Sequence, residues 1–221
     1  MIYGGCSMEL TLDILIREAK HFSEIFSAQN HTSLIGVTDG KAVGTYVEHL
    51  FQEYLHSKYV MTVGSSALGI DLPSVNTDIK TTSYTQPQSS CPFKSARQKI
   101  FGLGYNLLVF VYNKHDTAHS CTLKITHCTF IEADRTADYT ITALIRKMLS
   151  VDANKEDIIA LLNDKNVPGD DVTYNDLADE ILENPPEQGY LTISNALQWR
   201  LQYKRVIGLD NSITGVINYV W

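Results

Sequence analysis

Cysteines and long hydrophobic stretches are both scarce in this sequence. The chain has 4 cysteines in 221 residues, too few for the disulfide framework of a small secreted protein. No apolar run approaches the roughly 18 residues of a membrane span, and the N-terminus lacks the basic and apolar regions of a signal peptide. We therefore expect a cytoplasmic protein with reduced thiols and no membrane association.

Positive charge is also in short supply. The 18 lysines and arginines are outnumbered by 25 aspartates and glutamates, which gives a net charge of -7. Because contacts with phosphate need cations, this balance argues mildly against a nucleic-acid-binding protein. It does not exclude one, since a basic cleft needs only a few local cations. The hydrophobic fraction of 44% is typical of a globular protein with a substantial core.

The order of the expected elements indicates an α/β fold. Apolar residues at helical spacing predict amphipathic helices over residues 8–28 and 41–56. The nearly unbroken apolar run at 106–112 predicts a strand that is buried on both faces. The other strands are expected at residues 59–63, 77–84, 122–131, 199–207 and 212–221, with a loop at 86–92 and a short basic helix at 94–101.

The segment at about 138–185 differs from the rest of the chain because it is helical throughout. Helices are expected there over residues 141–148, 152–162 and 175–182. We therefore expect a single domain over residues 1–221. It would have a mixed central β-sheet flanked by helices and a helical insertion at about 138–185.

Three polar residues in one short segment form the candidate site. Asp78 and Lys80 are two residues apart in an expected strand, so their side chains leave the same face. Ile79 points to the opposite face, although its backbone carbonyl could still reach a metal ion. The turn expected at residues 73–76 would fold the chain back and bring Asp71 beside Asp78.

These residue types suit metal-dependent hydrolysis of a phosphodiester. Two carboxylates placed together repel each other unless a cation lies between them. Mg²⁺ favours a site with few carboxylates, completed by water and phosphate oxygens. The lysine would orient or help to deprotonate the attacking water and stabilise negative charge at phosphorus. Asp71, Asp78 and the carbonyl of Ile79 are therefore the expected metal ligands.

Glu48 is a further candidate ligand on the helix expected before this segment. It lies on the polar stripe of the helix, one turn after Gly44. The glycine would allow the helix to approach the sheet closely. A carboxylate at that position could contact the metal directly or through water. Glu53, on the next face of the helix, is the alternative.

The combined pattern resembles a known superfamily. Lys41-x-x-Gly44-x-x-x-Glu48 followed by Asp71-x6-Asp78-x-Lys80 resembles the PD-(D/E)xK nucleases, especially the mismatch-repair nicking enzyme MutH and related restriction enzymes. The resemblance covers about residues 41–112. Two departures are the Lys41-Ala42 pair, where MutH-like enzymes have Lys-Gly, and Asp78, where they have Glu.

The resemblance implies a restriction-endonuclease-like core and a type II restriction endonuclease. Such an enzyme would be a homodimer that hydrolyses double-stranded DNA at a short specific site. It would use Mg²⁺, with Mn²⁺ as a substitute, and would have a cognate DNA methyltransferase as its functional companion. Asp71, Asp78, Lys80 and Glu48 would be its catalytic residues. The alternatives are a MutH-like nicking or repair endonuclease and a non-catalytic DNA-binding protein of the same fold.

Two polar segments are the expected DNA contacts. One directly follows the catalytic strand and combines cations with glutamines, which bind phosphates and adenine edges respectively. The other lies near the C-terminus, where Arg200, Gln202 and Lys204 are expected on one strand face. The acidic 138–185 insertion would repel DNA, so we interpret it as a dimerisation or scaffold element. The predicted DNA-binding residues are Gln86, Gln88, Ser89, Lys94, Arg97, Gln98, Lys99, Arg200 and Lys204.

Overall fold

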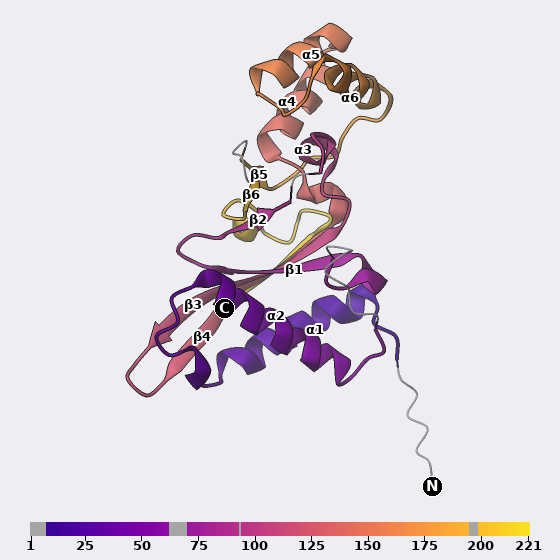
Figure 1. Ribbon diagram of the computed structural model, residues 1–221. Coiled ribbons are helices and arrows are strands. Elements are labelled where there is room, and N and C mark those ends of the chain that lie inside the picture. Colours follow the sequence, from indigo (N-terminus) through magenta and orange to yellow (C-terminus); the bar gives the residue numbers. More distant parts are fainter. Residues whose placement is uncertain (1–7, 62–69, 93, 195–198) are drawn as a thin grey trace. The chain divides into compact units, whose positions relative to one another are not determined.

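The protein is described here from a computed structural model, which covers residues 8–61, 70–92, 94–194 and 199–221 (Figure 1). The chain divides into two compact units. Unit 1 comprises Met1–Pro87, Leu107–Phe130 and Ile217–Trp221, and unit 2 comprises Gln88–Asn106 and Ile131–Val216. The single domain expected over residues 1–221 stays a prediction.

A four-stranded sheet is the centre of unit 1. Its strands are β1 (Thr77–Ser83), β3 (Asn106–Asp116), β4 (Cys121–Ile131) and β7 (Val216–Val220), in the order β1-β3-β4-β7. Helices α1 (Leu12–Ser27) and α2 (Gly40–His56) lie together along one side of this sheet in Figure 1. Strand β1 is therefore at an edge, next to α2.

Aromatic packing holds the two helices on the sheet. The rings of Phe22 on α1 and Phe51 on α2 are 4.9 Å apart, and Phe51 meets Phe110 of β3 edge-on at 5.1 Å. Phe51 and Phe110 are fully buried. Ile79 of β1 belongs to the same core, so its side chain faces the helices as expected. This packing sets the rotation of α2 relative to β1.

Unit 2 contains a small sheet and a helical segment. Its strands β2 (Gln88–Cys91), β6 (Trp199–Gln202) and β5 (Thr192–Ile193) form an antiparallel sheet in the order β2-β6-β5. The helices are α3 (Arg97–Phe101), α4 (Tyr139–Leu149), α5 (Lys155–Asp164) and α6 (Asp171–Glu183), which share an apolar core. Four short 3-10 helices complete the described elements of the chain, at Thr32–Leu34, Pro73–Val75, Ala133–Thr136 and Val206–Gly208.

The expected α/β architecture, with a central sheet flanked by helices, is confirmed. The two N-terminal helices, the strands from residues 77, 106 and 122, and three helices within 138–185 are all present. Strand β3 is buried on both faces over Leu107–Tyr112. No helix in the described part of the chain is long and apolar enough to cross a bilayer.

Several local expectations were wrong. The expected loop at 86–92 contains strand β2, because pairing with β6 compensates for the weak strand preference of its sequence. The expected strand at 199–207 ends at Gln202, and the basic helix begins only at Arg97. The expected strand at 59–63 is reduced to one bridge between Val60 and Glu9 over its described residues, and 62–63 lie outside them.

Candidate active site

A tight turn brings Asp71 back beside β1. The backbone N–H of Leu72 donates to the carbonyl of Thr77 at 2.9 Å, and the N–H of Thr77 donates to the carbonyl of Leu72 at 3.1 Å. The 3-10 helix Pro73–Val75 lies between them and ends at Asn76, which adopts a left-handed conformation with φ 47°. Asparagine tolerates this region better than most residues. The turn expected from the sequence therefore exists.

Asp71 is tied directly to the edge of the sheet. Its Oδ2 accepts a hydrogen bond from the backbone N–H of Ile79 at 2.9 Å. Backbone N–H and C=O groups point alternately to the two sides of a strand. The N–H of Tyr84, just beyond β1, donates to the carbonyl of Tyr112 on β3. The odd-numbered residues of β1 therefore direct their backbone groups away from β3, to the open edge of the sheet. The carbonyl of Ile79 shares this open edge with the carboxylate of Asp71.

Glu48 reaches the same edge from α2. Its carboxylate accepts a hydrogen bond from the backbone N–H of Thr81, the next outward-facing residue of β1. Gly44 lies beside this contact, since a Cβ built there would be 3.6 Å from the Thr81 carbonyl and 3.9 Å from Glu48 Oε1, which are ordinary contact distances. Asp71 and Glu48 thus accept hydrogen bonds from successive outward N–H groups of β1.

Thr81 did not stand out in the sequence. Its position directly after Lys80 on the strand is the only local signal that it had. Its Oγ1 is buried without a hydrogen-bond partner among the described residues, and its Cβ would be 3.8 Å from a Cβ at Gly44. The hydroxyl is thus a polar group beside Glu48 that is available to a water molecule.

Asp78 and Lys80 leave one face of β1 as an ion pair. Lys80 Nζ lies 2.7 Å from Asp78 Oδ2, and the two side chains are 24% and 6% exposed. Burial raises the pKa of Asp78 well above its usual value, with Asp71 adding to the rise and Lys80 opposing it. Burial alone would lower the pKa of Lys80, but the neighbouring carboxylates, that of Asp78 foremost, outweigh it and raise this pKa.

The charge balance of the site favours an additional cation. Burial raises the pKa of Glu48 to about 7; Lys80 opposes the rise, while Asp71 and Asp78 add to it. Three carboxylates therefore compete for one ammonium group. No three His, Cys, Asp or Glu side chains in the described ranges are grouped into a complete metal site. The donor set nevertheless fits a hard divalent cation, since it consists of crowded carboxylate oxygens, a backbone carbonyl and an unpaired buried hydroxyl.

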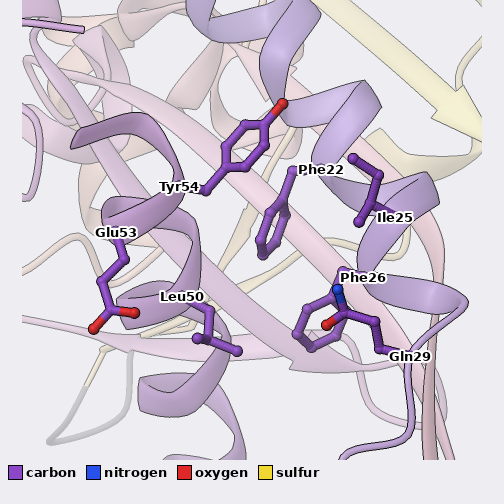
Figure 2. A pocket seen from close by; sticks show the side chains of 7 residues that line it. All are labelled: Phe22, Ile25, Phe26, Gln29, Leu50, Glu53 and Tyr54. Carbon is purple, nitrogen blue, oxygen red and sulfur yellow. The ribbon is translucent and has the colours of Figure 1, made fainter. Parts of the chain in front are cut away.

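The alternative glutamate on α2 faces elsewhere. Glu53 is exposed and lines a groove between α1 and α2, together with Phe22, Leu50 and Tyr54 (Figure 2). This groove is on the α1 side of the helix, whereas Glu48 bonds β1. Of the two candidates, Glu48 is the one that the fold places with Asp71, Asp78 and Lys80.

The expected DNA contacts divide into buried and exposed residues. Gln98 and Lys99 are 8% and 3% exposed. The Gln98 amide bonds the backbone of Lys94 and Leu103, and the Lys99 ammonium lies 5.7 Å from the Trp199 ring centroid. A direct DNA contact by Gln98 or Lys99 does not fit this burial.

The other members of the predicted set are placed more variably. Arg97 forms a bidentate ion pair with Glu180 through bonds of 2.6 to 3.0 Å. The Ser89 hydroxyl bonds that of Tyr203 at 2.5 Å. Exposed or half-buried side chains remain at Gln86 in unit 1 and, in unit 2, at Gln88, Lys94, Arg200 and Lys204.

Comparison with known proteins identifies the family. Residues 9–218 match the family of the type II restriction enzyme NspV. The chain belongs to this family. One curated member of it, the type II restriction enzyme NspV of Nostoc sp. (strain ATCC 29411 / PCC 7524), is 54% identical over 210 residues, which cover 94% of this chain and 96% of the relative. No solved structure matches the NspV-family chain.

This NspV-family protein is therefore a site-specific type II restriction endonuclease that acts on DNA. The function expected from the motif is confirmed at this level. The nicking-enzyme and non-catalytic alternatives are not retained, because the match extends over nearly the whole of both chains.

Proposed function

We propose that this restriction enzyme hydrolyses both strands of double-stranded DNA at the edge of β1. Asp71, Asp78, Lys80 and Glu48 are its catalytic residues. The observation that supports this most is that Asp71 and Glu48 accept hydrogen bonds from neighbouring N–H groups of the strand that carries Asp78 and Lys80. Mg²⁺, with Mn²⁺ as a substitute, would be held by Asp71, Asp78, Glu48 and the Ile79 carbonyl, and would polarise the phosphate and lower the pKa of bound water.

Lys80 has a defined part in this proposal. The carboxylates of Asp78, Asp71 and Glu48 raise its pKa, which favours the protonated ammonium as a hydrogen-bond donor. A protonated Lys80 can donate hydrogen bonds to the attacking water or to a phosphate oxygen. It thereby stabilises the negative charge that develops at phosphorus. Asp78 holds the ammonium in position through the 2.7 Å ion pair.

Cleavage of a supercoiled plasmid tests this assignment. Asp78→Ala and Lys80→Ala are each expected to abolish Mg²⁺-dependent cleavage while leaving DNA binding measurable. The matched control is Lys114→Ala, which removes the ion pair that Lys114 makes with Asp116, also two residues away on a strand of unit 1. Cleavage by either active-site variant at the wild-type rate would overturn the proposal. Chelation of divalent metal should stop cleavage by the wild-type enzyme, and added Mg²⁺ should restore it.

The partners follow from the same proposal. A two-fold symmetric homodimer suits cleavage of both strands of a palindromic site, and a cognate methyltransferase would protect that site in the cytoplasm of the host. The proposed DNA contacts are the exposed Gln86, Lys94, Arg200 and Lys204 and the half-buried Gln88. A dimer predicts linear plasmid products with uniform ends and a mass in solution of twice the monomer. Nicked circles as the final product would contradict it.

A further inference from the structure

The small sheet of unit 2 has one exposed polar face. On β6, Trp199 and Leu201 are buried, whereas Arg200 and Gln202 are exposed. Directly opposite residues of an antiparallel pair share a face. The register places Gln88 and Thr192 opposite Gln202, and Ser90 opposite Arg200. This face therefore consists of the exposed Ser90, Thr192, Arg200 and Gln202 and the half-buried Gln88.

The other face of this sheet anchors it. Cys91, Trp199, Leu201 and Ile193 are each at most 3% exposed. Ser89 lies opposite Leu201, and its hydroxyl bonds that of Tyr203. Two residues that are adjacent in sequence, Ser89 and Ser90, thus have opposite surroundings. The buried face holds the backbone under the polar side chains in a fixed geometry, which is what a recognition surface requires.

Charge also distinguishes this face. None of its five residues is acidic. Arg97 and Arg135, elsewhere in unit 2, are paired with Glu180 and Glu187. Arg200 forms no ion pair with any residue that the structure describes. Its guanidinium is available to an external acceptor, and the glutamines beside it add neutral donors and acceptors.

We propose that this face enters the major groove and reads base edges, with Arg200 on a guanine and Gln202 on an adenine. The major groove admits a β-ribbon, and these are the bases that arginine and glutamine bind with two hydrogen bonds. Residues two apart on a strand are about 6.7 Å apart, close to two base-pair steps of about 3.4 Å each. Gln88, opposite Gln202, reaches a neighbouring base, and Ser90 and Thr192 border the contact.

This inference rests on the proposed function only in taking double-stranded DNA as the bound substrate. Its test therefore measures binding apart from cleavage. The probe is a short duplex with the sequence that the wild-type enzyme cuts, located by sequencing the ends of plasmid fragments. Its affinity is compared with that of an unrelated duplex, with Ca²⁺ in place of Mg²⁺. A variant that no longer cleaves DNA but still discriminates between the two duplexes would bear on the catalytic residues and not on this face.

Gln202→Ala is expected to weaken binding of the specific duplex by about 5- to 150-fold and to leave binding of the unrelated duplex unchanged. Arg200→Lys keeps the charge but loses the two-pronged contact, so it should lose discrimination at one guanine. A 7-deaza purine, which lacks the N7 acceptor, should weaken wild-type binding at the positions read by Arg200 and Gln202. At the position read by Gln202, the 7-deaza purine should not weaken binding by Gln202→Ala any further. The same holds for Arg200→Lys at the position read by Arg200.

Two control variants complete the experiment. Lys124→Ala removes one exposed charge on β4, and Lys147→Ala removes one on α4; both should keep wild-type discrimination. Thermal melts identify any variant that is not folded. The inference would be overturned if a variant lost affinity equally for both duplexes. It would also be overturned if Gln202→Ala or Arg200→Lys kept the full discrimination of the wild type. Discrimination lost in Lys147→Ala as strongly as in Gln202→Ala would also overturn it.

Discussion

The carboxylate of Asp71 accepts a hydrogen bond of 2.9 Å from the backbone N–H of Ile79. This bond connects a loop residue to the exposed edge of β1, between Asp78 and Lys80. It also brings the Asp71 carboxylate to the edge at which the Ile79 carbonyl lies. The placement of Asp71 therefore depends on the backbone of β1 and not on the side chain at position 79.

Two substitutions of Asp71 should separate charge from structure. Asp71→Asn keeps an oxygen that can accept from Ile79, whereas Asp71→Ala loses both the acceptor and the charge. Both should lower the cleavage rate by at least about 100-fold, as expected for a lost metal ligand. Only Asp71→Ala should lower the free energy of unfolding, by about 1 kcal/mol, measured by urea denaturation. Full activity in Asp71→Asn would show that the negative charge is not used.

Glu48 and Glu53 form a matched pair on α2. Glu48→Gln should reduce the cleavage rate by about 10- to 100-fold, because it removes a carboxylate that shares the β1 edge with Asp71. Glu53→Gln changes an exposed residue in the groove beside α1 (Figure 2) and should leave the rate unchanged. Single-turnover cleavage of a plasmid gives both rates. The reverse order of effects would assign the role to Glu53.

Gly44→Ala should stabilise the protein without impairing cleavage. A Cβ at this position makes ordinary contacts of 3.6 Å or more, and alanine in a helix interior is favoured over glycine by about 0.5–1 kcal/mol. The new methyl group would lie 3.9 Å from Glu48 Oε1, an ordinary contact that does not displace this carboxylate, so the cleavage rate should stay close to that of the wild type. Thermal melts and single-turnover rates check the two effects. Thr45→Ala, at an exposed position on the same helix, should not affect cleavage.

A buried carboxylate far from the site should control acid stability. Burial alone would raise the pKa of Glu18, but hydrogen bonds from Lys58, Tyr54 and Tyr59 outweigh it and lower this pKa to about 2. A lowered pKa in the folded state stabilises the fold above the ordinary value of 4.5, and this contribution is lost as the pH falls towards 2.

Tyr59→Phe tests this cluster, since the Tyr59 hydroxyl donates to Glu18 Oε1 at 2.8 Å. The variant should lose about 1.5–3 kcal/mol of unfolding free energy at neutral pH. The difference from wild type should shrink as Glu18 becomes protonated below pH 4.5. Urea denaturation across this pH range measures it. Tyr84→Phe, at a residue that is 53% exposed, is the control, and a deficit that does not change with pH would contradict the explanation.

Much of the fold and the centre of the site were predictable because they depend on local patterns. The two-residue spacing of Asp78 and Lys80 puts them on one strand face wherever β1 lies, and their ion pair agrees with this. The turn from Pro73 to Asn76 was also a local signal. The burial of Gln98 and Lys99 was not predictable, since their packing against residues distant in sequence such as Trp199 has no local signature.

The sequence by itself determined which strand carries the acidic pair and the lysine, because strand periodicity is a property of neighbouring residues. Only the tertiary structure decided that Glu48 and not Glu53 joins them, because the rotation of α2 is set by the packing of Phe51 against Phe22 and Phe110. The tertiary structure likewise decided that Ser90 faces outwards and Ser89 inwards. Strand β2 has little strand preference of its own, and its pairing with β6 sets the two faces.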